Sequence, residues 1–168
     1  MLWGRWLHKK HTFAQESNVH YNKSMERRLY LDNCCFNRPY DDQSSLKNHL
    51  ESEAKLYIQK EILQKHYELA WSYILDYEIS FNPFSERKTQ IVKWKNVAVV
   101  DIDESEEVLA LANTLAMKHI KPKDALHVSC AVKAECRFFI TTDAKLLKKS
   151  LNAIIIVDPI DFIKMLEV

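Results

Sequence analysis

Short apolar runs alternate with longer amphipathic segments along this chain from residue 29 onward. Runs such as residues 29–31, 97–102 and 138–142 have the length and composition of buried strands, and the segments between the runs are long enough for helices. Strands and helices that alternate in this way build a parallel sheet with helices packed on both of its faces. The sequence therefore predicts an α/β fold of three layers, α/β/α, around a central, mainly parallel sheet of five strands.

The same pattern predicts where the elements lie. Strands are expected over residues 29–31, 68–74, 97–102, 138–142 and 153–157. Helical segments are expected over residues 44–65, 75–82, 85–95, 103–119, 123–136, 144–149 and 159–166, with a polar loop between the first strand and the first helix.

Residue spacing also predicts helix faces and helix ends. In the first long helix, apolar residues recur at every fourth position, which predicts one buried face: Leu46, Leu50, Ala54, Ile58 and Ile62. Asp103 and Glu106 have the spacing of a capping box that starts the helix after the third strand. Asp158, directly before Pro159, is expected to cap the last helix.

Glycine and cysteine usage excludes several classes of site. Gly4 is the only glycine, so the chain lacks the glycine-rich loops that hold nucleotide phosphates, and ATP, GTP, NAD and FAD are not expected as cofactors. The cysteines show none of the spaced pairs of a zinc site or a disulfide framework, because Cys34 and Cys35 are adjacent and Cys130 and Cys136 fall in one predicted helix. We therefore expect reduced thiols.

The charge is balanced, with 24 Lys+Arg against 23 Asp+Glu, so recognition of a charged partner has to depend on local charge. No apolar run approaches the roughly 18 residues of a membrane span, and no export segment is recognisable, so we expect a cytoplasmic protein without a membrane partner. Residues 1–24 show neither alternation nor a helical stripe, and we expect either a flexible extension or a segment outside the native fold. The remaining residues, 25–168, are expected to form one domain.

Four acidic residues stand at the ends of predicted strands or at the start of a predicted helix. They are Asp32 after the first strand, Glu78 after the second, Asp124 at a helix start and Asp143 after the fourth strand. Because ligands bind outside the carboxyl ends of parallel strands, we expect these residues to be neighbours at one edge of the sheet. Clustered carboxylates repel one another unless a cation compensates them, and oxygen ligands suit Mg²⁺ or Mn²⁺. The pattern therefore predicts a divalent metal site.

Four segments resemble the PIN-domain ribonucleases, including VapC-type toxins: YLDNCC (30–35), DYEIS (76–80), KPKDALHVSCAVKAE (121–135) and FFITTD (138–143). The resemblance covers about residues 27–166. The sequence departs from the family pattern at AEC (134–136), where a glycine often stands. It departs again at Asn33, which follows the first acid in place of a small hydroxyl residue.

The resemblance implies that the metal-binding acids of the family fall on Asp32, Glu78, Asp124 and Asp143, with Asp76 as the alternative to Glu78. It also implies a homodimer and a cognate antitoxin protein as partners. Thr141 and Asn33 are expected to support the metal site, although Thr141 also suits a strand as a β-branched residue.

Other polar residues lie near the acids in the sequence. His127 is on the same helical face as Asp124 and is expected as a packed, hydrogen-bonded histidine, with a substrate contact or the orientation of a carboxylate as the alternatives. Basic residues flank the acids and form either an RNA-binding rim or an ordinary solvated face: Arg38, Lys121, Lys123, Lys145, Lys148 and Lys149.

The acids and the family resemblance together predict an endoribonuclease that depends on Mg²⁺, with Mn²⁺ as a possible substitute, and that hydrolyses RNA phosphodiesters by in-line displacement. The resemblance further implies the toxin of a type II toxin–antitoxin pair. The alternative is a PIN-like module that binds RNA or protein without cleaving.

Overall fold

A five-stranded parallel sheet forms the centre of the computed structural model, which describes residues 26–166. The strands are β1 (Arg28–Leu31), β2 (Glu68–Ser72), β3 (Val100–Ile102), β4 (Phe138–Ile140) and β5 (Ile155–Val157). Their order is β3-β2-β1-β4-β5, and every neighbouring pair is parallel. The predicted fold class and the five-stranded parallel sheet are therefore confirmed.

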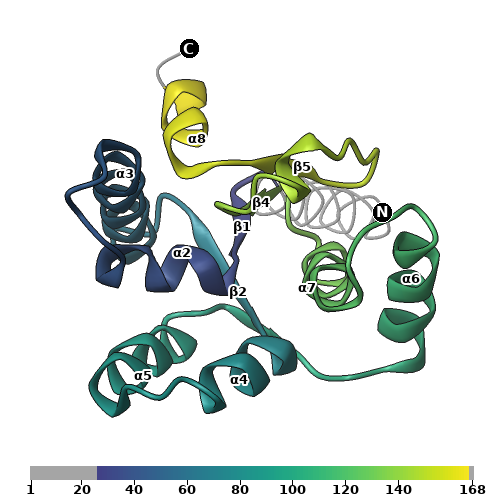
Figure 1. Ribbon diagram of the computed structural model, residues 1–168. Helices are drawn as coiled ribbons and strands as arrows, with labels where there is room; N and C mark the ends of the chain where they lie inside the picture. Colours follow the sequence, from purple (N-terminus) through teal and green to yellow (C-terminus); the bar gives the residue numbers. More distant parts are fainter. Residues whose placement is uncertain (1–25, 167–168) are drawn as a thin grey trace, which may run out of the picture.

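Helices cover both faces of this sheet (Figure 1). On one side α3 (Leu46–Leu63) packs against α8 (Pro159–Leu166), and on the other side α6 (Glu106–Ala116) packs against α7 (Pro122–Lys133). Two further helices, α4 (Tyr73–Ser80) and α5 (Ser85–Val92), lie side by side at one end of the molecule. The remaining helical segments are α2 (Asn33–Asn37), η1 (Arg38–Tyr40), η2 (Lys93–Asn96) and η3 (Leu146–Lys148).

The core lies between the sheet and its two helical layers. The strands carry apolar residues on both faces because helices cover both, as is usual for a parallel sheet. Tyr30 on β1 and Phe139 on β4 are partners in the strand register, and their rings stack with centroids 5.3 Å apart. Trp71 on β2 is fully buried and packs against Phe36 of α2. No helix within residues 26–166 is long and apolar enough to cross a membrane.

The predicted buried face of α3 is wrong in its first two turns. Ala54, Ile58 and Ile62 are buried as predicted, but Leu46 is 72% exposed and Leu50 is 47% exposed. The first half of α3 contacts η1 and α2, and it buries polar residues there: Glu51, Ser52 and Lys55. The neighbouring elements, which local periodicity does not specify, therefore change the buried face along the helix.

Several predicted boundaries also differ from the structure. The expected polar loop after β1 contains α2 and η1, and β3 begins at Val100 instead of residue 97. Ser105, not Asp103, caps α6, because its hydroxyl accepts a hydrogen bond from the N–H of Val108 at 3.3 Å. The cap of α8 is as predicted, since Asp158 accepts hydrogen bonds from the N–H groups of Ile160 and Asp161. The prediction for residues 1–24 lies outside the described residues.

Candidate metal centre at the carboxyl edge of the sheet

Asp32 lies at the point where the chain leaves β1 beside β4. Its backbone N–H donates to the carbonyl of Ile140 at 2.9 Å, so the residue is fixed by the pairing of these two strands. Its carboxylate is largely buried and accepts hydrogen bonds from the Thr141 hydroxyl at 2.7 Å and from the Asn33 N–H at 2.7 Å. The strand order changes direction between β1 and β4, which is where ligands bind in open parallel sheets. Asp32 therefore stands at the expected position of a ligand site.

Glu78 reaches the same edge from α4. Its Oε2 lies 2.7 Å from Nε2 of the buried His127, and its Oε1 lies 3.1 Å from the ammonium of Lys123. Burial alone would raise the pKa of Glu78, but hydrogen bonds and charges from His127 and Lys123 outweigh burial and hold this pKa below its ordinary value. Glu78 is therefore ionised at neutral pH and is held in one position.

Asp124 and Asp143 both lie near Lys121. Lys121 lies 3.2 Å from Asp143 and 3.9 Å from Asp124. Burial and then the negative charge of Asp32 raise the pKa of Asp124, and Asp143 adds to this effect while Lys121 opposes it. The pKa of Asp143 is lowered, chiefly because its carboxylate accepts a hydrogen bond from the N–H of Leu146. Asp124 thus senses the charges of both Asp32 and Asp143, which shows that the three carboxyl groups share one electrostatic environment.

Asp32, Glu78 and His127 form a group of side chains that could hold a metal ion. Ligand atoms of Asp32, Glu78 and His127 all lie within 4.8 Å of one another. The edge carries four carboxylates and two lysines that pair with them, Lys121 and Lys123. If all four acids are ionised at neutral pH, two negative charges therefore stay uncompensated. A hard divalent cation with oxygen ligands matches both this charge and this chemistry.

His127 belongs to this cluster by distance, but both of its ring nitrogens are engaged. Nδ1 lies 2.7 Å from the Tyr30 hydroxyl, which in turn lies 2.6 Å from the Ser72 hydroxyl. Because an ionised carboxylate only accepts hydrogen bonds, Nε2 carries the proton that it donates to Glu78. The expectation of a packed, hydrogen-bonded histidine is therefore confirmed, and its contact with Glu78 adds a role in orienting an acid.

Asp76 and Asn33, both named from the sequence as candidates, have side-chain contacts away from the metal centre. Asp76 accepts a hydrogen bond from the Trp71 indole at 2.9 Å and pairs with Lys95 at 2.6 Å, whereas Glu78 joins the Asp32 cluster. The side-chain oxygen of Asn33 accepts a hydrogen bond from Asn37 at 3.1 Å, and it is the backbone of Asn33 that contacts Asp32.

Arg38 also lies in a different environment from the one expected of an RNA-binding residue. Its Nε is 2.9 Å from the buried Glu51, and its Nη1 is 2.8 Å from Asp41. Arg38 therefore joins η1 to α3. Lys123 contacts Glu78, and a small hollow of about 50 Å³ beside Asp124 is lined by Lys121, Lys145 and Lys149. Lys148 is exposed on η3.

Sequence reasoning missed three residues of the site. Tyr30 and Ser72 lie within strands, and their sequence pattern indicates only buried strand residues. The Tyr30 hydroxyl contacts Ser72 and His127, and this contact is known only from the tertiary structure. The sequence predicts only a reduced thiol for Cys34, yet this thiol lies 3.3 Å from both Asp32 and Thr141. Its position two residues after Asp32 was the available signal.

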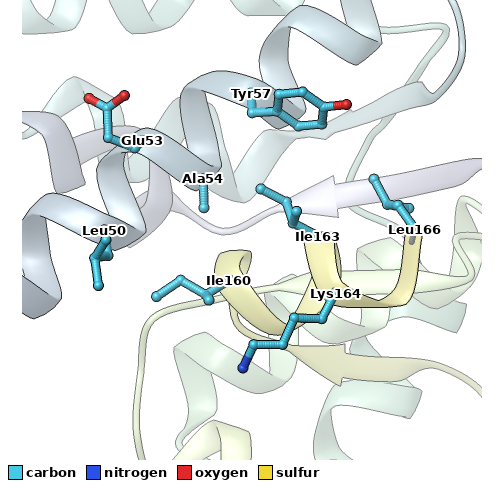
Figure 2. A pocket seen from close by; sticks show the side chains of 8 residues that line it. All are labelled: Leu50, Glu53, Ala54, Tyr57, Ile160, Ile163, Lys164 and Leu166. Atoms are coloured by element: carbon cyan, nitrogen blue, oxygen red, sulfur yellow. The ribbon is translucent and has the colours of Figure 1, made fainter. Parts of the chain in front are cut away.

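A larger groove lies elsewhere, between α3 and α8, with a volume of about 530 Å³ (Figure 2). Figure 2 shows that Leu50 and Tyr57 of α3 face Ile160 and Ile163 of α8 across it. None of the four candidate acids lines this groove, and its apolar lining offers no metal ligands apart from Glu53. The groove is therefore separate from the candidate metal centre.

The chain is similar to known proteins in structure but matches none in sequence. No protein-family model and no curated protein matches the chain in sequence. Among solved structures, the chain is similar to the VapBC2 complex of Rickettsia felis, which was solved bound to a DNA fragment from its promoter. That similarity has a TM-score of 0.49 and 18% sequence identity, and it covers 77% of this chain and 96% of the other.

The contact between Glu78 and Lys123 leads to a test of the site's electrostatics. In a Lys123→Met variant, the pKa of Glu78 is expected to rise toward its ordinary value, because one of the charges that lowers it is removed. Carboxyl-carbon NMR titration of the metal-free protein measures this pKa. Lys148→Met is the matched control and should leave the Glu78 titration unchanged. A Glu78 pKa that does not move in Lys123→Met would show that the ion pair does not persist in solution.

The lowered pKa also predicts a pH dependence of stability. A carboxyl group whose pKa is lower in the folded than in the unfolded chain stabilises the fold above its ordinary pKa, and this contribution is lost as the pH falls through the folded value. Glu78 is therefore expected to contribute stability at neutral pH that disappears in acid. In Lys123→Met this part of the acid sensitivity should be smaller in urea unfolding curves measured as a function of pH.

Proposed function

We propose that this protein is a metal-dependent endoribonuclease that hydrolyses RNA phosphodiester bonds, with Mg²⁺ as the preferred ion and Mn²⁺ as a substitute. One observation carries the proposal. Asp32 lies close to Glu78, and its charge also acts on Asp124, so acids from three different elements gather around Asp32, although such a grouping is unfavourable without a cation. The segments that resemble PIN-domain ribonucleases contain these same residues.

In this proposal each residue of the candidate metal centre has a defined role. Asp32, Glu78, Asp124 and Asp143 hold the ion, which would supply Lewis-acid activation of water and neutralise the phosphate charge. Thr141 donates to Asp32 and fixes its carboxylate, and His127 does the same for Glu78. Outer hydrogen bonds of this kind commonly change metal affinity or activity by roughly 10–100-fold when they are removed. Lys121, Lys123 and Lys145 lie at the rim, where they can contact phosphates of the strand.

A second candidate function is a PIN-like module that binds RNA or a protein without cleaving. It is favoured by the ion pairs of Lys121 with Asp143 and of Lys123 with Glu78, because these lysines already compensate part of the acidic charge. In this case the lysines would keep the acids in position without a metal ion.

Metal dependence separates the two candidates. The nuclease is expected to cleave an unstructured RNA in Mg²⁺ or Mn²⁺ and to lose this activity in EDTA, with recovery when the ion is added back. Isothermal titration of the metal-free protein should detect binding of Mn²⁺. If the protein takes up no ion and leaves RNA intact while still binding it, the module is the correct function.

The remaining expectations are proposals that follow from the family resemblance. We propose a homodimer and a cognate antitoxin encoded next to this protein, as for the toxin of a type II pair. Light scattering of the purified protein, alone and with the product of an adjacent short reading frame, tests both. The four free cysteines agree with a cytoplasmic location, which we also propose.

A further inference from the structure

Four aromatic side chains are exposed on η1, on α4 and in the turn that leads into α5. They are Tyr40, Tyr77, Phe81 and Phe84, and we call them the aromatic surface. Phe81 is 68% exposed, Tyr77 54% and Phe84 53%. Tyr77 and Phe81 meet edge to face, with ring centroids 4.9 Å apart. Exposed apolar groups that gather in one place commonly mark a binding site, whereas single exposed residues need no explanation.

A cation lies among these rings. The guanidinium of Arg87 is 4.0 Å from the ring centroid of Phe84 and 5.0 Å from that of Tyr40, so it stacks between the two. Lys123 lies near enough to Tyr77 for the two groups to interact electrostatically. The surface thus combines flat aromatic faces with positive charge.

The aromatic surface is joined to the candidate metal centre in two ways. Tyr77 directly precedes Glu78 on α4. In addition, Asn82, which lies between Phe81 and Phe84, donates a hydrogen bond to Asn37 at 3.1 Å, and Asn37 donates to Asn33 at 3.1 Å. Asn33 follows Asp32, so a chain of amide hydrogen bonds connects the turn between α4 and α5 to the first acid.

We propose that the aromatic surface binds unpaired bases of the RNA strand whose phosphates reach the acids, a proposal that rests on the proposed function. Bases stack on aromatic rings and on guanidinium planes, and proteins that read single-stranded RNA use both. Tyr77 directly precedes Glu78 on α4, and Phe81 caps the end of this helix three residues after Glu78. In this proposal the bases next to the phosphate at the acids stack on these two rings. Phe84 and Arg87 continue the stack away from the acids. Substrate preference is therefore for single-stranded over double-stranded RNA.

Binding without cleavage tests this surface directly. The full-length protein in EDTA is titrated into a short, unstructured, fluorescein-labelled RNA, and the dissociation constant is read from fluorescence anisotropy. The variant Phe81→Ala/Phe84→Ala is expected to weaken binding by at least about tenfold, because each lost base–aromatic stack is worth roughly a factor of five or more. Tyr57→Ala, which removes an exposed aromatic residue of α3, is the matched control and should bind as the unchanged protein does. Unchanged melting temperatures confirm that each variant is folded.

Two further variants distinguish a stacking surface from a merely apolar one. Phe81→Trp/Phe84→Trp keeps aromatic faces and should bind within about threefold of the unchanged protein, whereas Phe81→Leu/Phe84→Leu keeps apolar area and should bind as weakly as the alanine variant. Leucine variants that retain full affinity would overturn the proposal in favour of an apolar protein partner. Equal affinity for the same RNA annealed to its complement would overturn it as well.

The outcome is independent of catalysis. If the alanine variant loses RNA binding but no metal ion activates cleavage, the aromatic surface stands and the nuclease is rejected. If RNA is cleaved and the alanine variant binds as the unchanged protein does, the nuclease stands and the aromatic surface is rejected.

Discussion

Asn in place of Asp124 or Asp143 is expected to reduce metal-dependent RNA cleavage by at least about a hundredfold, while the protein stays folded. Removal of an outer hydrogen bond at a metal site already costs roughly 10–100-fold, and these carboxylates would be direct ligands. Asparagine keeps the shape of aspartate but lacks the charge that holds a divalent cation. Initial rates with an unstructured RNA in saturating Mg²⁺, together with a Mn²⁺ titration, measure the loss.

The two variants should differ in stability, because the two carboxyl groups have opposite pKa shifts. The pKa of Asp124 is raised, first by burial and then by the charge of Asp32, so ionised Asp124 lowers stability and the loss develops as the pH rises through its folded pKa. Asp124→Asn should therefore be at least as stable as the unchanged protein at neutral pH. The pKa of Asp143 is lowered, chiefly by the N–H of Leu146, so ionised Asp143 stabilises the fold and Asp143→Asn should be slightly less stable.

Asp103→Asn provides the matched control, because Asp103 is an exposed aspartate before α6 and has no contact with the acids. It should cleave RNA at the rate of the unchanged protein. Full activity in both Asp124→Asn and Asp143→Asn would reject the assignment of the metal centre. A loss of activity that comes with unfolding would be visible in the same urea curves, so the two causes are separable.

Phe139→Ala is expected to lower the free energy of unfolding by about 3–5 kcal/mol, the usual cost of removing a buried aromatic side chain from a core. Phe139 is fully buried on β4 and stacks against Tyr30 of β1. The cavity would also free the Tyr30 ring, whose hydroxyl contacts His127. Urea unfolding measures the change, and an unchanged slope with a lower midpoint shows that stability itself has changed.

Phe81→Ala serves as the comparison for this core variant, because it removes the same side chain from an exposed position. Its free energy of unfolding should stay within about 0.5 kcal/mol of the unchanged value. If Phe139→Ala costs less than about 1 kcal/mol, the β1–β4 interface is not as tightly packed as the structure describes.

The position of the acids followed from local patterns. Asp32 comes directly after β1, and Asp143 follows β4 after Thr141 and Thr142. Parallel strands bring such positions to one edge whatever the details of packing. The last helix was predicted over its full length because Asp158 and Pro159 mark its start chemically. Patterns of this kind depend on neighbours in the sequence, and they remain valid without knowledge of the tertiary contacts.

The environment of each side chain depended on contacts between distant residues. Glu78 and Asp76 are two positions apart on α4, and only the placement of His127 and Lys95 directs one to the acids and the other away.

On α3, the same periodicity predicted burial for Leu50 and Ile58, but the sheet and α8 cover only part of the helix, so Leu50 stays half exposed while Glu51 is buried against Arg38. The amino-acid order of this chain thus specified its five strands, its longer helices and the edge where its acids gather, but not the short helices α2 and η1. The tertiary structure decided which acids meet and which faces are covered, because burial and charge pairing are properties of elements that are far apart in the chain.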